Sequence, residues 1–175
     1  AAWHDVYRVR ISTGERTLVK QNTEKISGWV FDNAGALRLA TRTADNGDTE
    51  ILRVDDAGFT KIYACTVFES CGPVRFHKDN ARVYMLSNRG EADLIGLTLV
   101  DVATGAETFV EADPLKRVDL GGALFSDRTG ELILTTYVDD RSRRYFKDAA
   151  IEADFKWLEQ QLPNREIGLG SSTKD

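Results

Sequence analysis

The sequence predicts an all-β fold, and more narrowly a partial β-propeller of four-stranded antiparallel blades with one inserted α-helix. A turn glycine recurs at intervals of 44 and 47 residues, at Gly14, Gly58 and Gly105. An aromatic residue ending a second kind of strand recurs at intervals of 45 and 49 residues, at Phe31, Phe76 and Phe125. Four short strands in about 45 residues is the period of a propeller blade. A β-sandwich is not expected to keep so regular a repeat.

Each repeat contains two interleaved hairpins. A short apolar strand ends at the aromatic residue, and a polar turn leads to a second strand. A loop then leads to a third strand, and the glycine turn joins it to a fourth, because several hairpin turns need the positive φ that glycine adopts at least cost. The expected blade pieces are about 1–22, 23–68, 69–113 and 114–175 of one partial propeller domain.

The inserted helix is expected near residues 148–162. Its apolar residues have the spacing of an amphipathic helix and are Ile151, Phe155, Leu158 and Leu162. Asp148 is the expected N-cap, and Pro163 ends the helix. The following segment, "REIGLGSS", is expected to add one more strand. Since an open arc of blades leaves unpaired edges, the repeat predicts a piece of a larger protein.

The composition and charge of the chain argue against several classes of function. The chain has 175 residues, enough for one ordinary core, and a net charge of -5 that argues against nucleic-acid partners. No apolar run is long enough to cross a bilayer, and the start "AAWHDVYRV" does not read as a signal peptide. No membrane partner and no cofactor are therefore expected. Localisation stays open between the bacterial cytoplasm and the periplasm.

The two cysteines leave two interpretations open. Cys65 and Cys71 have five residues between them, so they could bridge a short loop in an oxidising compartment or remain two partly buried thiols. Together with His4 and His77 they do not have the spacing of a zinc site, so no metal site is expected. His77 lies in an inter-strand turn, where a packing role is favoured over a catalytic one.

The repeated phrases also resemble a known family. "FDNAGALRL", "FSDRTGELIL" and "FHKDNARVYML" resemble the aromatic, polar-turn, apolar-strand signature of TolB-type propeller blades, without its usual proline. The stretch "YVDDRSRRYFKDAAIEADFKWLEQQLPNREIGLGSST" is similar to the N-terminal propeller of bacterial prolyl oligopeptidase family serine peptidases, of the acylaminoacyl- and dipeptidyl-peptidase branch. The resemblance implies a propeller that gates a separate α/β-hydrolase domain and admits short peptides.

No catalytic residue is expected in this chain itself. A nucleophile elbow needs Gly-x-Ser-x-Gly, and the segment "GLGSSTKD" has no glycine two places after either serine. Family propellers supply Arg or Glu side chains that hold the peptide terminus. The nearest substrate-binding candidates are Arg141, Arg143 and Arg144, which are expected on a loop after an inner blade strand. A plain solvated loop is the competing interpretation of this basic cluster.

The expected partners follow from the incomplete set of propeller blades. They are the remaining blades and the C-terminal hydrolase domain of a parent peptidase, together with short peptides. An alternative is a TolB-like propeller that acts as a protein-binding module without hydrolase activity. The unpaired blade edges also predict, as a third hypothesis, a homo-oligomer in which arcs associate.

Overall fold

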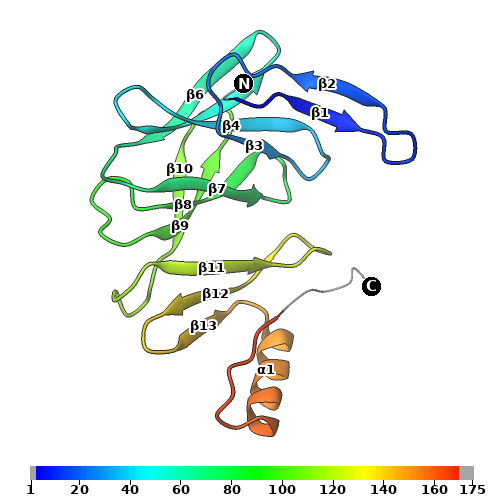
Figure 1. The fold of residues 1–175 in the computed structure, drawn as a ribbon. Helices are drawn as coiled ribbons and strands as arrows, with labels where there is room; N and C mark the ends of the chain where they lie inside the picture. The colour runs from blue at the N-terminus through cyan, green and yellow to red at the C-terminus, as the bar shows by residue number, and fades with distance from the viewer. Residues whose placement is uncertain (1–2, 170–175) are drawn as a thin grey trace.

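The computed structural model describes residues 3–169, which form thirteen β-strands and one α-helix (Figure 1). The strands are β1 (Val6–Val9), β2 (Arg16–Lys20), β3 (Gly28–Phe31), β4 (Leu37–Thr43), β5 (Thr49–Asp55), β6 (Gly58–Cys65), β7 (Cys71–Phe76), β8 (Arg82–Ser87), β9 (Gly96–Asp101), β10 (Glu107–Glu111), β11 (Leu120–Phe125), β12 (Leu132–Val138) and β13 (Ser142–Phe146). The helix α1 is Ala149–Gln161. None of the helical structure in this part of the chain is long and apolar enough to cross a membrane.

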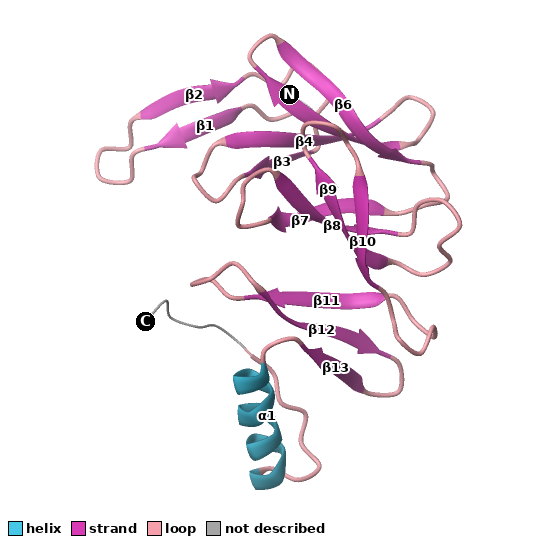
Figure 2. Ribbon diagram, turned by 180° about the vertical axis from the view of Figure 1, so that it is seen from behind, coloured by secondary structure: helices cyan, strands magenta, loops and turns pink. Residues whose placement is uncertain are grey.

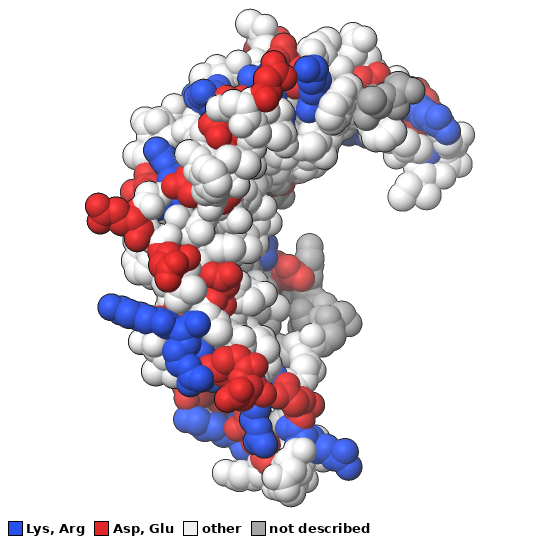
Figure 3. All heavy atoms as spheres, turned by 60° about the vertical axis from the view of Figure 1, so that its left-hand side comes forward, with Lys and Arg blue, Asp and Glu red and all other residues white. Residues whose placement is uncertain are grey.

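The strands form four antiparallel sheets in which neighbours in space are also neighbours in sequence. The first sheet is β1–β2, the second β3–β6, the third β7–β10 and the fourth β11–β13. The sheets follow one another from one end of the molecule to the other (Figures 1 and 2). The surface of the molecule is curved into a crescent (Figure 3). The predicted all-β class and the antiparallel four-stranded unit are confirmed.

The core consists of apolar layers between successive sheets. Leu39, Ile51 and Tyr63 of the second sheet pack against buried residues of the third, including Phe76 and Met85. A second layer joins the third and fourth sheets, and its buried members are Tyr84, Leu97, Leu99, Leu120, Phe125 and Tyr137. Because successive strand residues point to opposite faces, a sheet covered on both sides reads as a nearly continuous apolar run, as β8 and β9 do.

The turn glycines differ in how tightly they are enclosed. Gly14 and Gly105 have φ angles of 72° and 74°, the left-handed region that favours glycine. A Cβ on Gly14 would meet nothing within 4 Å. A Cβ on Gly105 would lie 2.1 Å from the carbonyl oxygen of Ile62, in β6. The β9–β10 turn of the third sheet therefore packs directly against the second sheet. Glycine is required at residue 105 because the backbone there has a positive φ and because a Cβ would clash with the Ile62 carbonyl.

The predicted helix is confirmed, with its N-cap. The Asp148 side chain accepts hydrogen bonds from the backbone N–H groups of Ala150 (2.9 Å) and Ile151 (3.2 Å). Phe155 is buried and its ring centroid lies 5.1 Å from that of Phe146 in β13, which attaches the helix to the fourth sheet. The strand expected at "REIGLGSS" is not formed by residues 165–169, and its remaining residues lie outside the described part of the chain.

Cys65 and Cys71 are joined by a disulfide bond. Cys65 is the last residue of β6 and Cys71 the first of β7, so the bond connects the second sheet to the third. Glu69, inside the closed loop, accepts hydrogen bonds from the backbone N–H groups of Thr66 (2.7 Å) and Gly90 (2.8 Å). The loop is thus closed covalently and fixed to the β8–β9 connection.

Replacing both cysteines with alanine is expected to lower the free energy of unfolding by about 2 kcal/mol, because the unfolded chain loses the constraint of a short closed loop. Urea unfolding with and without reductant measures this. Reductant should destabilise the native chain and leave the double variant unchanged. Coincident curves for the native chain in the two conditions would contradict a stabilising role for the bond.

Candidate substrate-binding site

The three candidate arginines do not share a loop, which corrects the expectation for this segment. Arg141 lies in the turn after β12, whereas Arg143 and Arg144 are neighbours on the strand β13, which pairs with β12. Neighbouring strand residues point to opposite faces, so these two side chains enter different environments. The strand was missed because one of its inward positions carries an arginine, which hides the alternation that predicts a half-buried strand.

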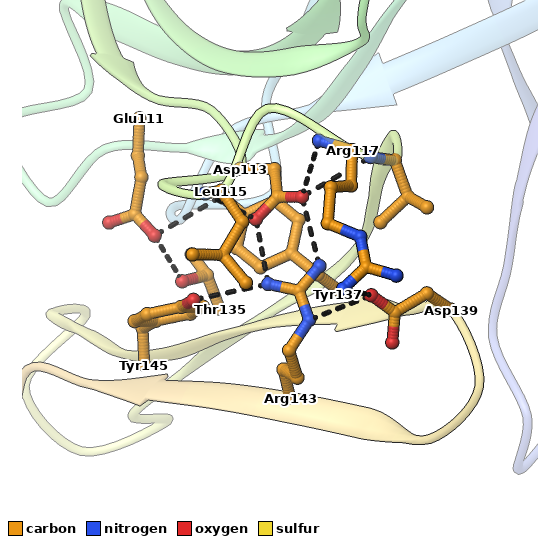
Figure 4. A network of polar contacts seen from close by, with 10 residues as sticks. Glu111, Asp113, Leu115, Arg117, Thr135, Tyr137, Asp139, Arg143 and Tyr145 are labelled. Atoms are coloured by element: carbon orange, nitrogen blue, oxygen red, sulfur yellow. Dashed lines mark hydrogen bonds and ion pairs between the residues drawn. The ribbon is translucent and has the colours of Figure 1, made fainter.

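Arg143 is held in a network of charged and polar groups (Figure 4). Its Nη1 and Nη2 atoms lie 2.8 and 2.9 Å from the two carboxylate oxygens of Asp113. Its Nε donates to Asp139 at 3.2 Å, and Nη1 also donates to the Tyr145 hydroxyl at 3.1 Å. The Asp113 side chain is 0% exposed, and that of Arg143 is 20% exposed. Four of the five guanidinium N–H donors are therefore already used within the protein.

Asp113 also organises the loop between the third and fourth sheets. Its carboxylate accepts hydrogen bonds from the backbone N–H groups of Leu115 (3.1 Å), Arg117 (2.9 Å) and Val118 (3.2 Å). The hydrogen bonds from Arg143, together with these N–H groups, hold the pKa of Asp113 well below its usual range. The pair is therefore ionised at neutral pH, and it ties the loop to β13.

A second carboxylate extends the network across β12. Glu111 accepts hydrogen bonds from the hydroxyl groups of Thr135 and Tyr137, the latter at 3.1 Å, and forms an ion pair with Lys147. Burial, together with the nearby negative charge of Glu111, raises the pKa of the Tyr137 phenol well above its usual range. Tyr137 is therefore a neutral hydrogen-bond donor and not a general base. These groups stabilise the contact between the third and fourth sheets.

Arg144 points to the other face of β13, toward the helix. Its guanidinium carbon lies 5.4 Å from the centroid of the Phe155 ring, and Nη2 donates to the carbonyl oxygen of Ile167. It lines a hollow of about 460 Å³ between β13, the end of α1 and the segment after the helix. The lining residues are Arg141, Ser142, Arg144, Glu159, Leu162, Asn164, Arg165 and Glu166.

This hollow, the β13–α1 pocket, carries both signs of charge. Arg141 and Arg165 contribute guanidinium groups, and Glu159 and Glu166 contribute carboxylates. Within residues 3–169 none of these four side chains takes part in an ion pair with another. Carboxylates accept hydrogen bonds from an ammonium group, and guanidinium groups donate to carbonyl or carboxylate oxygens. The pocket therefore has the chemistry to hold a short peptide by its polar backbone and termini.

Sequence patterns indicated only part of this arrangement. They singled out Arg141 and Arg144, which do line the pocket. Glu159 and Arg165 were missed, because they approach β13 only after the helix has packed on it. Asp113 was also missed, although "ADP" at residues 112–114 is a typical turn sequence in which the aspartate side chain bonds the following backbone.

The histidines are placed apart from the pocket. His77 lies in the β7–β8 turn, where Nδ1 is 2.9 Å from an Asp79 carboxylate oxygen and the ring is 5.7 Å from that of Tyr84. His4 lies on the exposed segment before β1. Within the described residues, no group of three or more His, Cys, Asp and Glu side chains is arranged to hold a metal ion. Of the residues considered for a nucleophile elbow, Gly170, Ser171 and Ser172 lie outside that range.

Comparison with known proteins relates the chain to the peptidases. It is 30% identical over 178 aligned residues to dipeptidyl aminopeptidase BIII of Pseudoxanthomonas mexicana. The alignment covers the whole of this chain and 25% of the relative, so the chain spans about a quarter of that protein's length. No family profile and no solved structure matches the chain.

Proposed function

We propose that this chain is a non-catalytic part of the β-propeller of a prolyl oligopeptidase family serine peptidase. The observation that carries the proposal is the similarity to dipeptidyl aminopeptidase BIII along the entire chain. Four successive antiparallel sheets, two of them complete four-stranded units, support it. Apolar layers between neighbouring sheets and a curved overall shape are what an arc of propeller blades requires (Figure 3).

In this proposal the arc scaffolds and gates a separate α/β-hydrolase domain, and short peptides are the substrates. The relative is named as a dipeptidyl aminopeptidase. The β13–α1 pocket offers Glu159 and Glu166 to a peptide ammonium group, and Arg141 to a carbonyl or carboxylate. Arg143 has no such role, because Asp113 and Asp139 already bind its guanidinium group.

The complete gene product tests this function. It is expected to react covalently with a fluorophosphonate probe of serine hydrolases and to release dipeptides from unblocked peptides. Absence of both labelling and hydrolysis would contradict the proposal. An unlabelled product that co-purifies with a stable protein partner would instead support the alternative, a propeller that serves as a binding module.

The contribution of the β13–α1 pocket to substrate binding is tested separately. Arg141→Met in the complete gene product should raise KM for short peptides by about tenfold, the loss of one charge-assisted hydrogen-bonded contact, with kcat less affected. Arg16→Met, an exposed arginine on β2, is the matched control and should leave both constants unchanged. Equal KM and kcat values for the Arg141 variant and the control would show that the pocket is not part of the substrate site.

A further inference from the structure

A second charged hollow lies between the third and fourth sheets, away from β13. It has a volume of about 310 Å³ and is formed by β7 and the turns that follow β3, β7 and β11. Arg75 of β7 lies over the Phe125 ring of β11, so the hollow lies where these two sheets meet. The lining residues are Asn33, Arg75, Lys78, Asp127, Arg128, Thr129 and Gly130. We name this hollow the β7–β11 pocket.

Arg75 differs from comparable arginines of the same molecule. Arg42 and Arg53, whose side chains are 29% and 30% exposed, each direct Nε to a carboxylate oxygen, at 2.8 and 2.7 Å. The Arg75 side chain is equally enclosed, at 29% exposed, yet its nearest carboxylate oxygen, on Asp127, is 3.7 Å away. Within residues 3–169 its guanidinium group makes no hydrogen bond. Since no buried side-chain nitrogen or oxygen of the described residues lacks a hydrogen-bond partner, the unused donors of Arg75 lie open to solvent, where an anion can reach them.

The position of Arg75 is nevertheless fixed. Its guanidinium carbon lies 5.2 Å from the centroid of the Phe125 ring, and that ring is buried. A cation–π contact of this kind holds the guanidinium group over the ring without using its N–H donors. The donors therefore remain available along the edge of the guanidinium plane, which is the geometry that binds a carboxylate through two parallel hydrogen bonds.

The other charges of the pocket leave it positive. Lys78 is neutralised by an ion pair with Glu131. Arg128, exposed in the β11–β12 turn, makes no ion pair with any described residue. Asp127 is 58% exposed and offers one carboxylate against the two guanidinium groups of Arg75 and Arg128. An anion that enters the pocket therefore meets a net positive charge and the N–H donors of the Arg75 guanidinium group, whose position is already fixed.

We propose that the β7–β11 pocket binds a carboxylate group, held by the guanidinium groups of Arg75 and Arg128. A planar carboxylate matches the fork of Arg75, and the volume of the pocket admits the end of a peptide or an acidic side chain. The site is separate from the β13–α1 pocket and does not depend on the peptidase function.

Titration of the ¹⁵N-labelled full chain, followed by NMR, tests the site. N-acetyl-glycylglycine carries a terminal carboxylate, and N-acetylaspartic acid α-amide carries a side-chain carboxylate. At least one should shift the signals of Asp127 to Gly130 and of the Arg75 Nε–H group, and the tighter of the two identifies the source of the carboxylate. N-acetyl-glycylglycinamide, which has no charge, should bind at least tenfold more weakly. Equal binding of this neutral probe would overturn the proposal.

Two variants keep the test independent of folding defects. Arg75→Met should weaken binding of the better carboxylate probe at least tenfold, while Arg16→Met binds like the native chain. Asp127→Asn, which keeps Arg75 and removes the competing carboxylate, should strengthen binding. Unchanged affinity in both pocket variants would overturn the assignment, and so would tighter binding of inorganic phosphate than of either carboxylate probe.

Discussion

Asp113→Ala is expected to lower the melting temperature of the chain by about 10 °C, a large effect for a single side chain. The substitution leaves the guanidinium group of Arg143, 20% exposed, without its bidentate partner. It also removes the acceptor for three backbone N–H groups of the loop between β10 and β11. Removing one member of an enclosed ion pair is costly because the remaining charge is left unpaired.

Thermal unfolding followed by circular dichroism measures this effect. Asp140→Ala is the matched control, because Asp140 is exposed in the β12–β13 turn close to Asp139. The control should unfold within about 2 °C of the native chain, as is usual for surface substitutions. Similar melting temperatures for the Asp113 and Asp140 variants would show that the network in Figure 4 does not hold the fourth sheet in place.

The same carboxylate predicts a pH dependence. Because Arg143 depresses the pKa of Asp113 in the folded state, the unfolded chain binds a proton there at higher pH than the folded chain does. The stabilisation is complete above the pKa of an unfolded aspartate, about 4, and is lost as the pH falls below it. Urea unfolding between pH 7 and pH 3 should show a shallower acid loss for Asp113→Asn than for the native chain. Parallel curves would contradict this assignment.

Gly105→Ala is expected to cost about 2–4 kcal/mol in the free energy of unfolding. A Cβ at this residue would lie 2.1 Å from the Ile62 carbonyl oxygen, a backbone atom that cannot rotate away, so the second and third sheets must separate. The positive φ of 74° adds about 1 kcal/mol for any residue with a Cβ.

Gly14→Ala separates the cost of the Cβ clash from the cost of the positive φ. Gly14 has nearly the same φ, 72°, but nothing lies within 4 Å of its Cβ position, so only the cost of about 1 kcal/mol remains. Urea unfolding of both variants gives the difference, which is the packing contribution. Equal losses for the two variants would show that the β9–β10 turn is not seated tightly on the second sheet.

The fold could be predicted from the repeat because the turn glycines and strand-ending phenylalanines that define it have similar structural roles in different copies. Gly14 and Gly105 both adopt the positive φ that their turns need. Phe76 and Phe125 are both buried against the preceding sheet. The corresponding Phe31 is 44% exposed, because the first sheet, with strands β1 and β2 alone, does not cover that position. Local spacing predicts the position of a side chain within its sheet, whereas its burial depends on what the neighbouring sheet supplies.

The candidate site was less accessible to sequence analysis. Arg143 and Asp113 are 30 residues apart, and nothing in "RSRRYF" marks one of its arginines as enclosed. A basic cluster resembles a solvated loop until its acidic partner is known, so β13 was expected to be a loop. The β13–α1 pocket likewise forms only when Phe155 packs on Phe146 and brings the end of the helix to the strand.

The structure of the complete gene product, determined by crystallography or cryo-electron microscopy, tests the central proposal most directly. We expect the sheets described here to be successive blades of a closed ring that covers an α/β-hydrolase domain. The sheets β1–β2 and β11–β13 should each be completed to four strands, with Phe31 covered. A product in which these sheets remain an open arc, or in which no hydrolase domain adjoins them, would contradict the proposal.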